Sequence, residues 1–508
     1  MIEGLTPEQN KREMNPERIE EGVWRPGILQ PFEASVGAGM STKLLKEAIG
    51  TTGGVRITGK RDRFNTPFDQ ATPEERLRRF TAGRILARLL ERIAPEVDPH
   101  KITKTALVHE RRIVHVDEQY LKQDLRTLAN TEADGLITSM KGVPLMVAAA
   151  DCAPVGVYDD ARKAIGVFHS GWKSTAQQIV PRGIDAMHRQ FGSSPDGLHV
   201  FIGPYSGANI YEVGSDVYDQ FRGMKTADDA PYYTENELQS IFKPHTDPAK
   251  SGKYFFDNGA AIRLSVIKAG VPEDHIELSQ HATMEEPQIF SSERIEGADK
   301  RDSNVTLMVL RSDERYRAIN GKRYPLIKIG EFGAPIDQQL MLREAGFYID
   351  YVQSPALQEL YAKIRLAVQE MKSEQEILGE VKNIVHALFA ISDKRSVERF
   401  DAQQRKKDGP LINIETFAAA GCGYCSHCSV VGALMIEKLK EEGILSGAVA
   451  IEDAYWSNEF VARGHMWVHY KDESGAITVV DIAQNFIGTE QEYASLLLTL
   501  KEEDLLDF

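Results

Sequence analysis

Three residues, Cys152, His169 and His109, have types and spacing that could do chemistry. Cys152 ends one apolar run (VPLMVAAADC), His169 lies near the end of the next (IGVFHS), and His109 closes an earlier run (ALVHERR). If these runs are neighbouring strands, their ends bring one thiol and two imidazoles together. This soft ligand set suits zinc, and three protein ligands leave a fourth position for water or substrate. Because a buried cysteine is often only a small hydrophobic residue, a structural role stays open on types and spacing alone.

A second group, Cys428, His465 and Asp481, has the residue types of a catalytic triad. Apolar residues recur at helical spacing after Cys428, whereas His465 begins an expected strand and Asp481 ends the next one. Unpaired N–H groups at a helix start favour a thiolate. The histidine would take the thiol proton, and the aspartate would orient the imidazole. The pattern predicts Cys428 as nucleophile, His465 as base and Asp481 as orienting acid.

The cysteines around Cys428 allow other interpretations. Cys422, Cys425 and Cys428 with His427 could supply a Cys₃His metal site or an iron–sulfur fragment, although no fourth cysteine lies nearby. A purely structural thiol cluster is a further alternative. Within the triad interpretation, Cys422 and Cys425 could be redox partners of Cys428.

The elements expected around these residues form an α/β domain followed by a different C-terminal unit. A helical pattern begins at Pro73, and short β-rich runs then alternate with helical patterns, which predicts a mixed sheet. The character changes near residue 311, where a charged, turn-rich stretch begins, followed by a long helical pattern that predicts two helices. Residues 392–410 are interpreted as a charged connector. The predicted organisation is an extension (1–60), an α/β domain (61–311), a linker with helices (312–400) and a cysteine-containing domain (401–508).

Composition narrows the function classes. The 508 residues include 60 Lys and Arg against 75 Asp and Glu, a net charge of −15, which argues against a nucleic-acid-binding protein. No apolar run is long enough for a membrane span, and the polar start lacks the apolar stretch of a secretory signal. Four sparse cysteines favour a reducing compartment. We therefore expect a cytoplasmic protein, with secretion by a signal-less route left open.

The motifs EADGLIT, ADCAPV, HSGWKST and GPYSGANIYEVG closely resemble those of the laccase-domain family over roughly residues 60–311. That family, called multicopper polyphenol oxidase in older descriptions, is associated with zinc-dependent purine nucleoside phosphorylase activity. The resemblance implies Zn²⁺ bound by His109, Cys152 and His169. It implies phosphorolysis of adenosine, inosine or guanosine, with adenosine deamination as a further activity, so that the partners are a purine nucleoside and phosphate.

The same resemblance implies substrate-side residues. Arg79, at the end of the N-terminal helix, takes the place of an arginine that holds an anion near the metal. Lys173 stands where the family has arginine, so a point charge replaces a planar donor. A polyphenol oxidase, as in the older description, is the poorer alternative, because only 13 histidines are present and no dense His-x-His pairs occur.

Residues 415–490 resemble the transglutaminase-like (papain-fold) superfamily. Cys428 heads the helix, Gly443-Ile444 ends it, His465-Met466-Trp467-Val468 follows, and Asp481 completes the order. The full fold expectation is thus an α/β laccase-like (cysteine-hydrolase-like) domain with a mixed sheet, a helical segment and an α+β transglutaminase-like domain. The resemblance implies acyl transfer or hydrolysis on a protein substrate. Two alternatives stay open. The protein could be a secreted effector or toxin that modifies host proteins through Cys428, with a first domain that is a nucleotide-binding scaffold. It could also be a non-catalytic protein whose sites have decayed.

Overall fold

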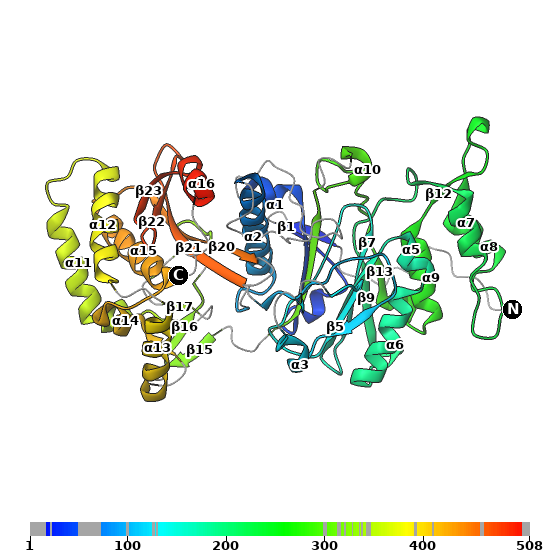
Figure 1. The fold of residues 1–508 in the computed structure, drawn as a ribbon, viewed down its shortest axis with the longest axis horizontal. Coiled ribbons are helices and arrows are strands. Elements are labelled where there is room, and N and C mark those ends of the chain that lie inside the picture. Colours follow the sequence, from blue (N-terminus) through cyan, green and yellow to red (C-terminus); the bar gives the residue numbers. More distant parts are fainter. Residues whose placement is uncertain are drawn as a thin grey trace. The chain divides into compact units, whose positions relative to one another are not determined.

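The chain divides into two compact units, each of which is considered by itself (Figure 1). The structure is a computed structural model that describes residues 17–499 apart from 21–22, 49–72, 98–100, 124–126, 129–130, 298–301, 312–315, 320–321, 328, 335, 337–338, 342–346, 391–393, 409–410 and 458–461. Unit 1 comprises Met1–Arg63, Arg92–Ala94 and Lys101–Arg311, and unit 2 comprises Phe64–Glu91, Pro95–His100 and Ser312–Phe508. No helix in the described part of the chain is long and apolar enough to cross a membrane.

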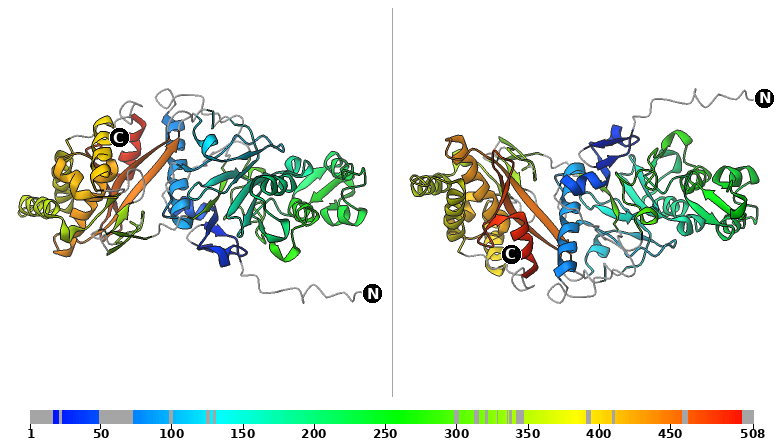
Figure 2. Two further views of the ribbon diagram at one scale, coloured as in Figure 1. Left: turned by 90° about the horizontal axis from the view of Figure 1, so that it is seen from below. Right: turned by 90° about the horizontal axis from the view of Figure 1, so that it is seen from above.

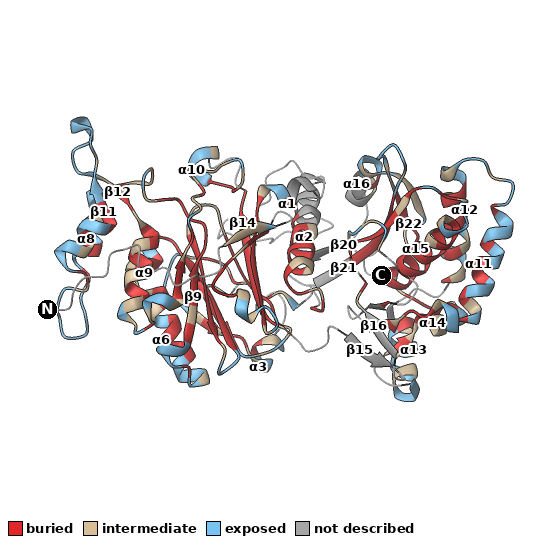
Figure 3. Cartoon of the chain, turned by 180° about the vertical axis from the view of Figure 1, so that it is seen from behind, coloured by how far each residue is buried: buried red, intermediate tan, exposed pale blue. Residues whose placement is uncertain are grey.

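Unit 1 contains a mixed six-stranded sheet, which confirms the predicted sheet type. Its order is β13 (Ile276–Leu278), β9 (Leu198–Ile202), β7 (Ala153–Asp159), β8 (Ala164–Ser170), β5 (Gly135–Thr138) and β4 (Ile113–His115). The pairs β13/β9 and β4/β5 are parallel, and the central pairs are antiparallel. Both faces of β7 and β8 are buried, which explains their continuous apolar sequences. Figure 3 shows the buried strands as continuous red ribbons.

A second sheet and a layer of helices bury the two faces of the six-stranded sheet. The second sheet has the order β1 (Arg18–Glu20), β2 (Val23–Arg25), β3 (Val36–Ser41), β14 (Asn304–Leu310) and β6 (Leu145–Ala149). One apolar cluster joins its side chains to Tyr158 and Val167. On the other face, α6 (Ile179–Phe191) and α9 (Asn258–Lys268) pack on the same sheet. Gly183 of α6 permits this close approach, because a Cβ there would lie 2.2 Å from the Phe168 ring.

The remaining elements of unit 1 surround this core. They are α1 (Lys43–Ala48), α3 (Glu118–Leu121), α5 (Trp172–Ala176), α7 (Ser215–Arg222), α8 (Glu235–Ile241), α10 (Glu293–Glu296) and a small sheet of β10 (Glu212–Gly214), β12 (Lys253–Phe256) and β11 (Phe242–Pro244). The small sheet and α7 and α8 enclose an apolar cluster of their own, which includes Phe221, Phe242 and Phe256.

Residues expected to form an N-terminal extension instead belong to a core sheet of unit 1. β3 pairs along its length with β14, so the described residues before 60 are part of this unit. Gly39 is required by packing, because a Cβ there would lie 2.7 Å from Val23 Cγ1.

Unit 2 combines helices with an antiparallel sheet. The sheet has the order β20 (Ala448–Ser457), β21 (Ala462–Lys471), β22 (Ile477–Asp481) and β23 (Phe486–Thr489). The first three strands match those expected from the sequence, whereas β23 was not expected. The helices are α2 (Pro73–Ile93), α11 (Pro355–Ala367), α12 (Glu374–Leu388), α13 (Lys394–Asp408), α14 (Ile414–Ala420), α15 (Cys425–Glu441) and α16 (Glu490–Thr499). Short strands β15 (Tyr316–Ile319), β16 (Lys322–Pro325), β17 (Leu340–Met341), β18 (Phe347–Tyr348) and β19 (Ile412–Asn413) complete it.

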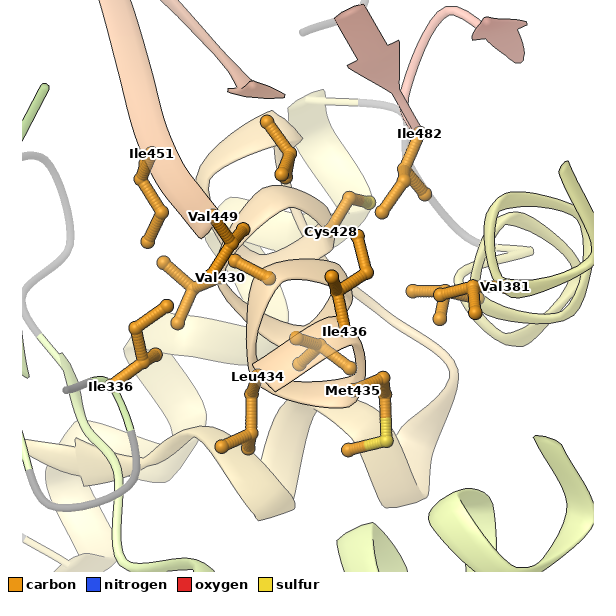
Figure 4. Close-up of a cluster of buried hydrophobic side chains, with 14 of the residues drawn as sticks. Ile336, Val381, Cys428, Val430, Leu434, Met435, Ile436, Val449, Ile451 and Ile482 are labelled. Carbon is orange, nitrogen blue, oxygen red and sulfur yellow. The ribbon is translucent and has the colours of Figure 1, made fainter. Parts of the chain in front are cut away.

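Helix α15 is the centre of unit 2. It is buried on nearly all sides, as expected for a helix that is apolar all round. Figure 2 shows the sheet on one side of the central helices and further helices on the other. Figure 4 shows α15 side chains meeting Ile451 from the sheet and Val381 from α12.

Two expectations about the helices differ from the structure. The charged stretch interpreted as a connector is helix α13, in which Arg405 and Asp401 form an i, i+4 ion pair and Val397 is buried. Most of the helix that begins at Pro73 groups with unit 2, although it was expected in the first domain. Within unit 2, Arg88 of this helix forms a buried ion pair with Glu452 on β20.

Candidate functional site

The side chains of His109, Cys152 and His169 come together at one end of β7 and β8. Strands β7 and β8 are antiparallel, with Ala153 opposite Ser170. Cys152, which precedes β7, therefore lies next to the end of β8, where His169 is located. The potential ligand atoms of the three residues all lie within 4.8 Å of one another. Cys152 Sγ is 3.9 Å from His109 Nε2, and the two imidazole ring centroids are 4.8 Å apart. The sequence prediction grouped the same three residues.

Asp134 holds two of the three candidate ligands in place. Its Oδ1 lies 2.8 Å from His169 Nδ1, which leaves His169 Nε2 available to a metal. The same carboxylate accepts hydrogen bonds from the backbone N–H groups of Val108, His109 and Glu110. His109 has a φ of 59°, in the left-handed region, and these bonds stabilise that conformation. In metal sites, a ligating histidine often donates a hydrogen bond to a carboxylate, which fixes the orientation of its ring.

Gly171 provides the space in which the thiol and the His109 ring lie. A Cβ at this position would be 2.7 Å from Cys152 Sγ and 3.1 Å from His109 Cδ2. The turn that contains Gly171 is fixed by buried hydrogen bonds, in which Asn258 Nδ2 donates to Ser170 O and Thr175 Oγ1 donates to Gly171 O. Any larger residue at position 171 must therefore displace a candidate ligand.

If the centre binds a metal ion, replacing Gly171 with alanine is expected to weaken the affinity for it, tested with Zn²⁺, about 10- to 100-fold, the range seen when a supporting residue of a metal site is lost. Competition with a chromophoric chelator measures the affinity. Gly197→Ala is the matched control, because a Cβ there meets nothing within 4 Å. Equal zinc affinity of the two variants would contradict the role assigned to Gly171.

Electrostatics in this centre favour a thiolate. Burial opposes ionisation of Cys152, but His169 and His109 overcome it and lower the pKa of the thiol to about 6. Burial likewise opposes the charge on His169, yet Cys152 and Asp134 raise the pKa of this imidazole to about 10. Near neutral pH the pair is therefore a thiolate and an imidazolium. A metal ion would displace the His169 proton, so that metal affinity rises with pH between these two values and falls more steeply below about 6.

Two residues near the centre were not identified from the sequence: Tyr211, which interacts with Cys152, and Arg294, which lies beside Tyr211. Burial and the Cys152 charge raise the pKa of Tyr211, and Arg294 acts in the opposite direction. The guanidinium carbon of Arg294 lies 5.1 Å from the centroid of the Tyr211 ring. The backbone N–H of Arg294 donates to Asp151 Oδ2, at 3.0 Å. The structure thus adds an exposed cation beside Tyr211, the ring that interacts with Cys152.

Of the two predicted phosphate-binding side chains, Lys173 and Arg79, the structure describes only the first. Lys173 is exposed on α5, with its Nζ 5.5 Å from the centroid of the Trp172 ring. Arg79 lies within α2, but its side chain falls outside the residues that the structure describes. The anion-binding roles of both residues stay predictions.

In unit 2, His465 and Asp481 form a buried pair on neighbouring strands. His465 Nε2 lies 2.6 Å from Asp481 Oδ2, and the two residues are 1% and 0% exposed. Asp481 also accepts hydrogen bonds from the Tyr493 hydroxyl at 2.6 Å and from the Gln484 N–H at 3.0 Å. Burial opposes the charge on His465, but Asp481 and then Cys425 raise the pKa of this imidazole to about 10. This geometry orients the imidazole and stabilises its protonated form.

The cysteine beside His465 is Cys425, so the prediction of Cys428 needs correction. Helix α15 begins at Cys425, which interacts with the His465 imidazole and helps to raise its pKa. Cys428 lies about one turn further along and packs among apolar side chains (Figure 4). Burial, and then the negative charge of Asp481, raise the pKa of the Cys428 thiol. Cys428 therefore remains protonated within the core, whereas Cys425 lies at the helix start that was assigned to the nucleophile.

The alternative of a metal site around these cysteines is not favoured by the geometry. The His109 centre is the only group of three or more potential metal ligands found in the described part of the chain. His427 instead accepts a hydrogen bond from the Tyr424 N–H at its Nδ1, at 3.0 Å, and packs against the rings of Phe347 and Phe417. Burial and the nearby Arg405 lower the pKa of His427 to about 3. All four cysteines are free thiols.

Comparisons with known proteins place the first half of the chain in a family. Residues 84–308 match the family model described as multi-copper polyphenol oxidoreductase laccase. A purine nucleoside phosphorylase of Bacteroides thetaiotaomicron is 30% identical over 200 residues, which cover 39% of this chain and 69% of that protein. Adenosine deaminase RL5, from an unknown prokaryotic organism, is 27% identical over 252 residues, which cover 49% of this chain and 88% of that protein.

Among solved structures, the hypothetical protein YfiH of Bacillus licheniformis is 24% identical, with a TM-score of 0.44, and the match covers 59% of this chain and 100% of that one. The residues matched by the family model include the His109, Cys152 and His169 centre. The chain therefore belongs to the multi-copper polyphenol oxidoreductase laccase family.

Proposed function

We propose that this protein is a zinc-dependent purine nucleoside phosphorylase whose centre is formed by His109, Cys152 and His169. The observation that carries the proposal is the convergence of these three ligands around a thiolate, with Asp134 fixing two of them. Relatives that bear this enzyme name support the choice of reaction. A polyphenol oxidase fits less well, because multicopper chemistry needs several copper sites and the described residues bring together one three-ligand group.

The donor chemistry of the centre fits Zn²⁺. One thiolate and two imidazole nitrogens form a soft set with room for an external fourth ligand. Zn²⁺ bound by these residues would supply Lewis acidity, which polarises a substrate oxygen. The chain itself keeps the thiol ionised, orients the His169 ring through Asp134 and holds the His109 loop in its left-handed conformation.

The proposed reaction transfers a ribosyl group to phosphate. A phosphate oxygen forms a bond to C1′ of the nucleoside while the C1′–N bond breaks, which gives ribose 1-phosphate and the purine base after it takes up a proton. Arg294, an exposed cation beside Tyr211, is proposed to bind the phosphate, and Lys173 and Arg79 are proposed to assist. Tyr211 keeps its proton because its pKa is raised, so it can donate a hydrogen bond to the substrate.

The test is an assay of the zinc-loaded protein with adenosine, inosine and guanosine, with and without phosphate. We expect release of free base that requires phosphate and produces ribose 1-phosphate, as measured by chromatography. Release of ammonia from adenosine without phosphate would indicate deamination as a second activity of the same centre. No base release from any of the three nucleosides would refute the proposal.

A second candidate function belongs to unit 2, where we propose a thiol acyl transferase or hydrolase with Cys425 as nucleophile. Two observations support this proposal. His465 and Asp481 form a buried hydrogen bond, and Cys425 interacts with the same imidazole. Its substrate would be an amide or ester carbonyl, for example on a protein. We propose a transglutaminase-like fold for this part of unit 2. The alternative role as an effector that modifies host proteins would then act through Cys425 and not through Cys428. We propose the reducing cytoplasm as the place of action, because all four thiols are free.

A further inference from the structure

A cavity of about 320 Å³ lies in unit 1 between α6 and the edge of the six-stranded sheet at β4 and β5. It is separate from the three candidate metal ligands, none of which lines it. Its apolar lining includes Ile113 of β4 and Ile137 of β5. Its volume lies within the range of cavities that hold small molecules.

Three arginines from two different elements line this cavity. Arg111 precedes β4, and Arg182 and Arg189 are on α6, separated by about two turns. Asp185 is the only carboxylate in the lining, and it pairs with Arg189. The positive charge at this point contrasts with the net charge of −15 of the whole chain. A local excess of guanidinium groups around a hollow attracts and binds anions.

Arg182 is held in an orientation suited to binding. Its Nε donates to the backbone carbonyl of Gln177 at 3.1 Å, which restrains this cavity-lining side chain. A guanidinium group offers paired donors that match two oxygens of a phosphate group. The isoleucines beside these donors suit a carbon skeleton rather than a bare ion.

We propose that this cavity binds a phosphate monoester, such as a sugar phosphate or a nucleoside monophosphate. The phosphate group contacts Arg111, Arg182 and Arg189, and the carbon portion packs against Ile113 and Ile137. This site is distinct from the proposed phosphorylase centre and does not depend on its activity.

The cavity is also connected to the metal centre through one side chain. Gln177 accepts the Arg182 hydrogen bond at its carbonyl, and its own Nε2 donates to the His109 carbonyl at 3.3 Å. Arg111 follows His109 by two positions in the same loop. Arg111 and the Gln177 partner of Arg182 thus both adjoin the loop that carries His109.

Isothermal titration calorimetry of the full chain tests the proposal, with ribose 5-phosphate and AMP as the two monoester probes. Ribose without phosphate and inorganic phosphate without a carbon skeleton are the control ligands. The double variant Arg111→Gln/Arg182→Gln should weaken monoester binding by about tenfold or more, because charge-assisted hydrogen bonds are lost. Arg222→Gln is the control, since Arg222 is exposed, as Arg111 and Arg182 are, but lies outside the cavity.

The outcomes separate this site from the proposed enzyme centre. Cys152→Ala, which removes a metal ligand, should keep monoester binding, so a failure of the phosphorylase proposal leaves this inference standing. Tighter binding of ribose 5-phosphate would indicate a sugar phosphate as the ligand, and tighter binding of AMP would indicate a nucleoside monophosphate. Binding that is lost with Cys152→Ala but unchanged in the arginine double variant would overturn the inference. Equal affinity for inorganic phosphate and for both monoesters would also overturn it, because an adventitious ion only would then occupy the cavity.

Discussion

The Cys152→Ala protein is expected to lose its zinc and, with it, the phosphorolysis of purine nucleosides. The thiolate is the one anionic ligand of the centre, and the imidazoles alone leave a weak site. We expect zinc to fall from about one per chain to a small fraction of that, and kcat/KM to fall about a thousandfold or more. Elemental analysis and base release, measured on the same preparation, check both effects.

The control for this prediction is Cys428→Ala, which removes a different free thiol and should leave zinc unchanged. Because Cys152 is not fully buried, its replacement should leave the fold intact, as measured by circular dichroism and melting temperature. Full zinc content in Cys152→Ala, together with loss of zinc in Cys422→Ala or Cys425→Ala, would move the metal to the cysteine cluster.

The second large effect is expected at Cys425. Its thiol should react with iodoacetamide near neutral pH faster than Cys428, although the two are similarly shielded, at 1% and 4% exposed. The reason is that Cys425 adjoins a His465 imidazole whose pKa is raised to about 10, whereas burial keeps Cys428 protonated. His465→Ala should slow the labelling of Cys425 by about tenfold or more, because the ion-pair partner of the thiolate is lost. Mass spectrometry of the labelled cysteines gives the rates.

Two variants make this result specific to the proposed triad. Asp481→Asn should slow labelling less than His465→Ala, since it chiefly misorients the imidazole ring. Cys428→Ala should leave the labelling of Cys425 unchanged. If Cys425 and Cys428 react at equal rates that do not respond to His465, then no activated nucleophile is present and the cluster has a structural role.

The metal centre could be found from the sequence because its ligands lie where apolar runs end. The start of β7 pairs with the end of β8, so Cys152 and His169 lie close together in space. Asp134 could not be found in this way, because it acts through the backbone N–H groups of a loop that lies more than 20 residues earlier in the chain. Arg294 was missed because it approaches Tyr211 only after the chain has folded.

The nucleophile was misplaced because the start of α15 lacks the usual signals. Such starts are usually marked by Ser, Thr, Asp or Asn followed by Glu or Gln three residues later. Here Tyr424 precedes the helix, and His427, three residues on, accepts the hydrogen bond from the Tyr424 N–H. The start was therefore placed about one turn too late. Similarly, the charged residues of α13 concealed a helix because its single apolar face is narrow.

The single carboxylate of Asp134 has a consequence for how the centre acquires its metal. Since Asp134 fixes the His109 loop and the His169 ring from within the protein, the ligands stand in position before any ion arrives. The conformational entropy of ordering them is already lost when unit 1 folds. Removal of the ion by a chelator should accordingly leave hydrogen exchange at residues 108–110 slow, and reloading should be rapid and need no refolding. Such preorganisation would let the protein exchange its metal with the surrounding pool throughout its lifetime rather than only at synthesis.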